Sequence, residues 1–239
     1  MADSFDRPRD VWALIAAGGA SVRFGGETPK QFFELEGVPL FIHSVLKFAR
    51  YRETLGITVI APEKSLKFAE KAFGAHKADT AGVTVDFICG GTTRRRSVFN
   101  GVQHIINNKD VRIVLVHDAA RPFVTEGLIA KTADAARKYG AAIPCVKIAD
   151  AVKLWELKDY GETAGGIYIA RKTLDRETLV LAQTPQGFSF DILKRAHEAA
   201  DRDGYDGYDD ASLAERIGVY PVIIDGEREN KKITVREDL

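Results

Sequence analysis

A glycine-rich stretch near the N-terminus carries residues that could bind a phosphate group. The stretch "IAAGGASVRFGGETPKQF" (15–32) follows an apolar run and contains Gly18, Gly19, Arg23 and Lys30. Adjacent glycines allow a sharp turn that presents backbone N–H groups to an anion. Arginine can bind a phosphate as a planar fork and lysine as a point charge. These residues favour an anion site only slightly over an ordinary surface loop.

Two common nucleotide-binding patterns are absent from this stretch. The dinucleotide fingerprint needs glycines at the positions of Ala20 and Arg23. The P-loop needs Gly-Lys followed by Ser or Thr, whereas Lys30 stands between Pro29 and Gln31. The stretch alone therefore does not identify its ligand.

Two further stretches carry charged residues that could act on an anion. In "CGGTTRRRSV" (89–98), three arginines enter a predicted helix, where their charge opposes the helix dipole unless an anion compensates. The alternative is a solvated basic helix start, which we expect for one or two of the three. In 117–122, Asp118 could orient Mg²⁺ or ribose hydroxyls, or it could cap a turn or pair with Arg121.

The C-terminal "ENKKITVREDL" places two lysines side by side. We expect Lys231 and Lys232 on a strand, where alternation lets only one of them face a site. No Ser/His/Asp set and no activated cysteine accompanies these charges. Glycine turns, Arg, Lys and one Asp suit phosphoryl or nucleotidyl transfer, in which the protein positions groups and stabilises charge. The five histidines show no metal-ligand spacing, and Cys89 and Cys145 are interpreted as buried apolar residues.

The elements that must position these residues follow a β-α rhythm. Strand-length apolar runs occupy 11–17, 56–62, 83–89, 112–118 and 141–148, and helical periodicity occupies 39–50, 63–75, 94–106 and 124–140. This alternation predicts a three-layer α/β fold with a mostly parallel sheet. Ligands in such folds bind at the carboxyl ends of strands, so the stretches 16–30, 90–97 and 117–122 should meet at one rim.

The rhythm changes after residue 148. Short alternating stretches around polar turns predict a protruding β-arm at 150–183, suited to a dimer contact or a lid. Helices are predicted at 190–204 and 209–218, followed by a strand at 219–225, and "VREDL" resembles the first turn of a helix. We expect one domain, 1–239, with the arm as an insertion.

Composition excludes several classes of protein. The chain has 239 residues, of which 45% are hydrophobic and 28% are charged, as in ordinary globular domains. Lys+Arg and Asp+Glu both number 34, which argues against non-specific nucleic-acid binding. No apolar run has membrane-spanning length, and the polar start lacks the apolar core of a signal peptide, so a cytoplasmic protein is expected.

Taken together and in order, these motifs resemble the 2-C-methyl-D-erythritol 4-phosphate cytidylyltransferases of the non-mevalonate isoprenoid pathway. The matching motifs cover nearly the whole chain: "AAGG…RFG…PKQF" (16–32), "GGTTRRRSV" (90–98), "HDAARPFV" (117–124), "DAVK" (150–153), "DR" (175–176), "AQTPQGF" (182–188), "DDAS" (209–212) and "ENKKIT" (229–234). The resemblance implies a Rossmann-like nucleotidyltransferase fold that binds CTP and Mg²⁺, the metal being held mainly by the CTP phosphates. The 4-phosphate of methylerythritol would then attack the α-phosphate of CTP, and diphosphate would leave.

The resemblance also assigns roles to individual residues. The implied catalytic residues are Arg23, Lys30 and Lys232. The implied nucleotide-binding residues are Ala16, Ala17, Gly18, Gly19, Gly90, Arg94, Ser97 and Asp118. The implied sugar-phosphate-binding residues are Asp118, Arg121, Ala151 and Arg176.

Arg176 implies a quaternary structure, because in the family this arginine reaches the neighbouring subunit's site. We therefore expect a homodimer with shared sites, in agreement with the predicted arm. The chain departs from the family pattern at Ser21, where glycine is common, and at Ala151, where threonine often contacts the substrate. The resemblance implies a C-terminal helix, of which "VREDL" would form only the start.

Three other functions remain open at this point. A ribitol-5-phosphate or other sugar-phosphate cytidylyltransferase would use a similar site. A glycosyltransferase would need an Asp-x-Asp metal motif, for which only Asp209 and Asp210 are candidates. A non-catalytic nucleotide-binding protein should lack Lys30 and Lys232, both of which are present.

Overall fold

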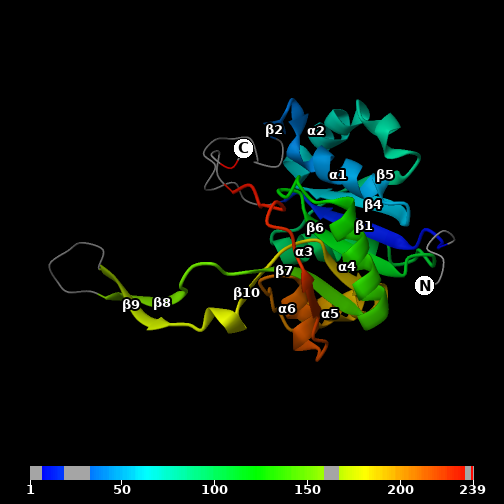
Figure 1. Ribbon diagram of the computed structural model, residues 1–239. Coiled ribbons are helices and arrows are strands. Elements are labelled where there is room, and N and C mark those ends of the chain that lie inside the picture. The colour runs from blue at the N-terminus through cyan, green and yellow to red at the C-terminus, as the bar shows by residue number, and fades with distance from the viewer. Residues whose placement is uncertain (1–6, 19–32, 159–166, 235–237, 239) are drawn as a thin grey trace.

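A computed structural model describes residues 7–18, 33–158, 167–234 and 238 of the chain (Figure 1). The helices are α1 (Leu40–Arg50), α2 (Glu63–Gly74), η2 (Lys77–Thr80), α3 (Arg94–His104), α4 (Glu126–Tyr139), η3 (Arg176–Thr178), α5 (Phe190–Arg202) and α6 (Asp210–Arg216). The strands are β1 (Val11–Ala16), β2 (Glu34–Leu35), β3 (Val38–Pro39), β4 (Thr54–Ala61), β5 (Thr84–Cys89), β6 (Ile113–Asp118), β7 (Ala141–Lys147), β8 (Lys153–Lys158), β9 (Ile167–Thr173), β10 (Val180–Ala182), β11 (Gln186–Ser189) and β12 (Val222–Asp225).

The central sheet of the described residues has eight strands. Seven follow the order β10-β7-β11-β6-β1-β4-β5, and β12 pairs with β7. The strands β6, β1, β4 and β5 run parallel, as the β-α rhythm predicts, so their carboxyl ends lie on one side. Strand β11, which was not predicted, runs antiparallel between β6 and β7. This insertion brings the "TPQ" segment beside the end of β6.

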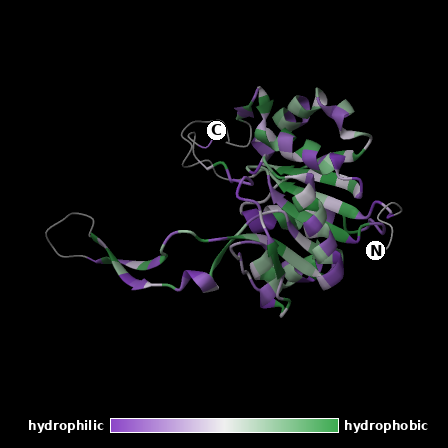
Figure 2. Ribbon diagram, in the orientation of Figure 1, coloured by the Kyte–Doolittle hydropathy of each residue, from purple (hydrophilic) through white to green (hydrophobic). Residues whose placement is uncertain are grey.

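The two faces of the sheet bury different side chains, which makes the three layers. On β1, Val11, Ala13 and Ile15 pack in a core with residues of α1, α2 and α4. Trp12 and Leu14 point to the opposite face, toward residues of α3, α5 and α6. Alternate residues of a strand face opposite sides, and both sides here are covered, so the strand is apolar throughout. Figure 2 shows the resulting hydrophobic strands between helices with hydrophilic outer surfaces.

A two-stranded arm projects from the sheet at the position expected from the change of rhythm. Strands β8 and β9 pair with each other in antiparallel register, and within the described residues they belong to no larger sheet (Figure 1). Residues 180–182, which the sequence analysis included in the arm, form β10 and pair with β7. The projecting hairpin is thus shorter than 150–183, because the chain has rejoined the main sheet before residue 183.

Two local predictions are wrong. Cys89 is exposed although it ends an apolar run, because the last residue of β5 lies at the rim of the sheet's edge strand; Cys145 is buried as expected. Residues 231–234 form no strand, since their backbone is held by single contacts such as Ile233 N to Ala120 O at 2.8 Å. The residues of "VREDL" lie outside the described part, except Asp238.

Among the described helices, none combines the length and the apolar composition that a membrane span requires.

Candidate active site

Three segments meet at the carboxyl ends of the parallel strands. The backbone continues past β1 with Ala17, whose N–H donates to Ile60 O at 2.8 Å. Gly90 follows β5, and its N–H donates to Ala61 O at 2.9 Å. Asp118 ends β6, directly opposite Ala16 of β1. The described parts of the three stretches therefore share one rim, as predicted.

Two glycines of this rim lie beside Ser97, and at Gly90 there is no room for a side chain. A Cβ atom on Gly90 would lie 2.8 Å from Ser97 Oγ, and one on Gly18 would lie 3.6 Å from it. Ser97 Oγ accepts a hydrogen bond from Gly91 N at 3.0 Å and donates one to Thr93 O at 2.8 Å. The hydroxyl therefore fixes the turn between β5 and α3, and the backbone beside it stays bare.

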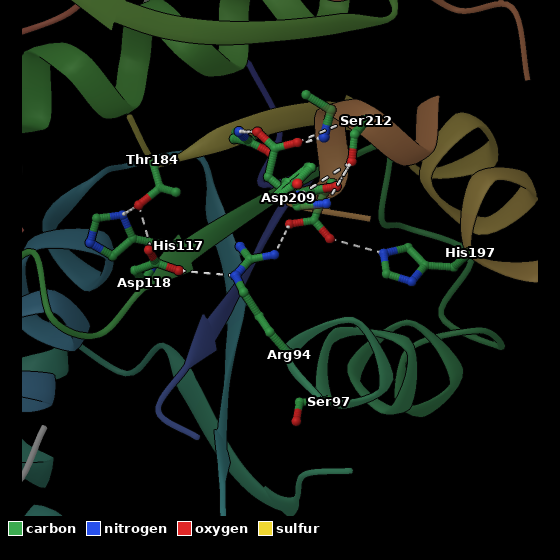
Figure 3. A network of polar contacts seen from close by, with 12 residues as sticks. Arg94, Ser97, His117, Asp118, Thr184, His197, Asp209 and Ser212 are labelled. Atoms are coloured by element: carbon green, nitrogen blue, oxygen red, sulfur yellow. Dashed lines mark hydrogen bonds and ion pairs between the residues drawn. The ribbon is translucent and has the colours of Figure 1, made fainter. Parts of the chain in front are cut away.

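Asp118 lies between two cations. Its Oδ2 accepts a hydrogen bond from Lys232 Nζ at 2.6 Å, and its Oδ1 accepts one from Arg94 Nε at 3.2 Å (Figure 3 shows the second contact). Burial disfavours the charge of Asp118, but attraction by Arg94 and Lys232 outweighs it and holds the pKa of Asp118 well below its usual range. The sequence analysis considered Arg121 as the partner of Asp118, whereas the described ion pairs of Asp118 are with Arg94 and Lys232.

Arg94 is in turn held by a second carboxylate. Its Nη1 donates to Oδ2 of Asp210 at 2.8 Å, and Oδ1 of Asp210 lies 3.0 Å from Nε2 of His197. His197 and Asp210 are fully buried. Burial opposes the charge of Arg94, but the two carboxylates outweigh it and raise its pKa.

The other two arginines of the cluster are also paired. Arg95 contacts Asp201 and Asp206, each at 3.1 Å, and Arg96 contacts Asp201. The cluster was expected to need a compensating anion, or for one or two of its arginines to be solvated; Arg96 is exposed, and the compensating anions are carboxylates of this chain. Carboxylates of α5 and of the segment after it supply the compensation for these two arginines, which leaves Arg94 as the one of the three that reaches Asp118.

A chain of neutral hydrogen bonds supports Asp118 from behind. Its backbone N–H donates to Thr184 Oγ1 at 3.1 Å, and that hydroxyl lies 3.1 Å from His117 Nδ1. His117 Nε2 lies 3.1 Å from Arg121 O, which accepts its hydrogen. Burial lowers the pKa of His117 to about 4, so the ring is neutral at pH 7.

Arg121 positions the segment that carries Lys232. Its Nη1 donates to Asn230 O at 2.8 Å, and Asn230 Nδ2 donates to Thr184 O at 2.8 Å. Burial lowers the pKa of Arg121. In the described chain this arginine therefore contacts the lysine-bearing segment, and a contact with sugar phosphate stays a prediction.

The remaining predicted residues divide into two groups. Gly19, Arg23, Lys30 and the unexplained Ser21 lie outside the described residues. Ala151 and Arg176 lie on the arm, where both are exposed and Arg176 contacts Ala149 O and Glu177. Within the described part of one chain, neither side chain contacts the rim residues. The structure thus brings together Ala17, Gly18, Gly90, Arg94, Ser97, Asp118 and Lys232, and it leaves the arm residues apart.

Sequence reasoning missed the residues that support the rim. These are His117, Thr184, Asn230, Asp210 and His197. Most stand inside motifs quoted above, "TPQ", "DDAS" and "ENKK", so their signal was the resemblance and not a chemical pattern. The two carboxylates considered for a glycosyltransferase metal motif have other partners. Asp209 caps α6 through Ser212 N at 2.9 Å, and Asp210 binds Arg94.

Comparisons with known proteins agree with this geometry. A family model described as 2-C-methyl-D-erythritol 4-phosphate cytidylyltransferase matches residues 11–239. A protein of that name from Geobacillus kaustophilus is 38% identical over 228 residues, which cover 95% of this chain and 92% of the relative. One from Syntrophus aciditrophicus is 36% identical over 233 residues, covering 96% and 92%. The crystal structure of the enzyme of that name from Thermus thermophilus superposes with a TM-score of 0.70 at 32% identity, covering 96% of this chain and 95% of the other.

Proposed function

Because the chain belongs to the 2-C-methyl-D-erythritol 4-phosphate cytidylyltransferase family, we propose that it transfers the cytidylyl group of CTP to 2-C-methyl-D-erythritol 4-phosphate. The products are 4-diphosphocytidyl-2-C-methyl-D-erythritol and diphosphate. The observation that carries this proposal is the family match over residues 11–239, joined to a rim where Lys232 and Arg94 flank Asp118. The comparisons do not favour the ribitol-5-phosphate alternative, and the relatives' names are those of enzymes.

In the reaction, a phosphate oxygen of the sugar alcohol attacks the α-phosphorus of CTP. A new P–O bond forms while the bond to the diphosphate oxygen breaks, and diphosphate leaves with the electron pair. Negative charge concentrates on the oxygens around the α-phosphorus, so cations held in place stabilise the transition state. We assign this role to Lys232, whose described position is at the rim, together with Arg23 and Lys30, which lie outside the described residues.

The bare backbone at Ala16, Ala17, Gly18 and Gly90 forms the proposed nucleotide side of the site. The N–H groups of Ala17 and Gly90 already donate within the sheet, but a backbone C=O has a second lone pair that can accept a hydrogen bond from the amino group of cytosine. Ser97 fixes the turn against which that edge would rest. A side chain at Gly90 would collide with Ser97 Oγ. This close approach supports a site in which glycine keeps the backbone accessible to the base.

Magnesium is proposed to arrive with the nucleotide. Across the ranges described, no three His, Cys, Asp or Glu side chains are grouped as a protein-built metal cage would require. Asp118 stands at the rim, and both its oxygens accept hydrogen bonds from cations. Mg²⁺ commonly binds through substrate phosphates and water with only one or two carboxylates, so this donor set fits a metal held mainly by CTP. When bound there, Mg²⁺ would neutralise phosphate charge.

The arm supports a homodimer as part of the proposal. Trp155 and Tyr168 stack edge to face with ring centroids 4.7 Å apart, yet both stay exposed in the single chain, at 63% and 68%. Leu157 and Ile167 beside them are exposed as well. Such an apolar patch on a thin hairpin suits burial against a second copy. Arg176, at the base of the arm, would then reach the partner's substrate phosphate.

A cytoplasmic location completes the proposal. Its support is that both cysteines are free, with Cys89 exposed to solvent, as is usual for proteins of a reducing compartment.

The test is a diphosphate-release assay with CTP, UTP, ATP and GTP, each paired with methylerythritol 4-phosphate or ribitol 5-phosphate. We expect turnover with CTP and methylerythritol 4-phosphate, abolished by a chelator and restored by Mg²⁺. A clear preference for ribitol 5-phosphate would overturn the choice of substrate. CTP binding by calorimetry without diphosphate release from any pair would overturn the enzymatic role.

A further inference from the structure

A buried histidine lies behind the rim and is connected to it through side-chain contacts. His197 Nε2 lies 3.0 Å from Oδ1 of Asp210, and Oδ2 of Asp210 accepts a hydrogen bond from Arg94 at 2.8 Å. Arg94 Nε donates to Asp118 at 3.2 Å, and Asp118 accepts from Lys232 at 2.6 Å. Figure 3 shows His197 on the side of Arg94 opposite Asp118. Asp210 and Asp118 therefore each contact two neighbouring side chains, one through each carboxylate oxygen.

The direction of the hydrogen bond from His197 follows from the charge of Asp210. Burial disfavours ionisation of Asp210, but attraction by Arg94 outweighs it, and the pKa of Asp210 is lowered. An ionised carboxylate only accepts hydrogen bonds, so His197 Nε2 carries the hydrogen and donates it. His197 Nδ1 has no hydrogen-bond partner among the described residues. The ring's polar contact in this part of the chain is therefore the one to Asp210.

Three helices fix this donor in place. The His197 ring, on α5, stacks on Phe99 of α3 with centroids 5.9 Å apart and planes 3° from parallel. Asp210 is the first residue of α6, next to the N-cap Asp209. Arg94 is the first residue of α3, the helix that also carries Phe99. The packing of the ring on α3 and its hydrogen bond to α6 therefore set where the Asp210 carboxylate meets the Arg94 fork.

We propose that His197 is a positioning residue, which donates to Asp210 so that Arg94 is aligned on Asp118 and Asp118 in turn holds Lys232. The side chain touches neither nucleotide nor sugar phosphate and acts through three intervening residues. Without the donor, Oδ1 of Asp210 is a buried acceptor with no partner, and the carboxylate turns or draws Arg94 away from Asp118. The kinetic consequence rests on the proposed function, because it is read in the transfer reaction.

The test compares two substitutions of His197 with a control on the other face of the sheet. His197→Phe keeps a planar ring against Phe99 and removes the donor, while His197→Gln places an N–H near the position of Nε2. Ile129→Ala opens a cavity in the core layer on the opposite face of the sheet. We expect kcat to fall about ten-fold in His197→Phe, as for other losses of alignment at a distance. His197→Gln should keep kcat close to that of the native chain, and Ile129→Ala should lower Tm with kcat unchanged at 25 °C.

A second readout is independent of turnover. The Arg94 Nε–H proton, assigned by its loss in Arg94→Lys, should exchange with solvent about ten-fold faster in His197→Phe than in the native chain, and at the native rate in Ile129→Ala. If the native chain does not turn over CTP, the proposed function fails, but this measurement still decides the positioning role. Native kcat and native Arg94 exchange in His197→Phe would overturn the inference. Equal losses in His197→Phe and His197→Gln would also overturn it, because the donor would then not be the cause.

Discussion

The rim of the sheet and the β8–β9 arm are built from contacts of different range. At the rim, Asp118 and Lys232 are 114 positions apart in the sequence, and Arg94 and Asp210 are 116 apart, yet each pair is in contact. On the arm, Trp155 meets Tyr168 across a single hairpin, and both rings stay largely exposed. The charged side chains of the rim are therefore paired within one chain, whereas the apolar side chains of the arm make few contacts within it.

A single folded chain completes the geometry of the rim, but it does not cover the apolar surface of the arm. Side chains at the rim are held by opposite charges on α3, β6, α6 and the C-terminal segment, so their geometry belongs to the folded protomer. An exposed apolar hairpin gains little from its own two strands. Its proposed role is complete only when a second copy covers it.

The largest effect is expected at the rim itself. Lys232→Ala should lower kcat by about 10²- to 10³-fold, because it removes a cation aimed at charge that develops in the transition state. Its neighbour supplies the matched control, since Lys231 is exposed and the ion pair with Asp118 is made by Lys232. Lys231→Ala should keep kcat within about two-fold of the native value. Steady-state diphosphate release at saturating CTP measures both, and equal kcat values for the two variants would contradict the assignment.

The second effect concerns stability against pH and arises behind the rim. Buried His117 has a pKa of about 4, below the ordinary value of about 6.5. The unfolded chain therefore binds a proton at pH values where the folded chain does not. His117 therefore contributes roughly 3 kcal/mol to the free energy of unfolding above pH 6.5, and this contribution is lost as the pH falls toward 4.

Urea unfolding at several pH values measures this loss. His117→Gln should flatten the dependence of the free energy of unfolding on pH between about 6.5 and 4. If the free energy of unfolding of His117→Gln depends on pH as steeply as that of the native chain, another group causes the loss of stability between about pH 6.5 and 4.

The third prediction tests whether the arm completes a partner's site. Arg176→Ala should raise KM for methylerythritol 4-phosphate about ten-fold, because a charged hydrogen bond to phosphate is lost, and should change kcat less. Arg171→Ala, which breaks an exposed arm ion pair with Glu156, is the control and should leave KM unchanged.

Mixing variants shows in which subunit Arg176 acts. Arg176→Ala and Lys232→Ala chains, mixed equally and allowed to exchange subunits, should recover about a quarter of the native activity at sugar phosphate below KM, since one site in each mixed dimer is intact. No recovery would place Arg176 in the site of its own chain.

The smallest effect on the protomer is expected on the arm's apolar face. Trp155→Ala removes one exposed cross-strand aromatic pair, worth about 0.2–1 kcal/mol to the hairpin. It should nevertheless increase dissociation of the proposed dimer, as measured by sedimentation over a range of concentrations. Tyr220→Ala, at an even more exposed aromatic on the main body, should leave the sedimentation unchanged. If Trp155→Ala and Tyr220→Ala dissociate to the same extent, the apolar face of the arm does not contribute to dimerisation.

Much of this molecule could be predicted from local patterns. The five apolar runs are the strands β1, β4, β5, β6 and β7, with boundaries that differ by no more than two residues, because a strand buried on both faces must be apolar throughout. Strand β11 was not predicted, because its four residues, "QGFS", are too few to show the alternation of apolar and polar residues that marks a strand. Lys231 and Lys232 were placed on a strand from alternation, but their segment is held by Arg121 and Asn230 instead.

The sequence by itself determined the layers, the rim where the glycines and charges gather, and the family. Only the tertiary structure decided how those charges are paired. Composition and spacing cannot tell that Arg94 reaches Asp210 while Arg95 and Arg96 reach Asp201, because ion pairs over a hundred residues apart depend on where helices α5 and α6 dock. The physical reason is that periodicity reports burial of each element separately, whereas a buried charge is stable only beside a partner that the whole fold must deliver.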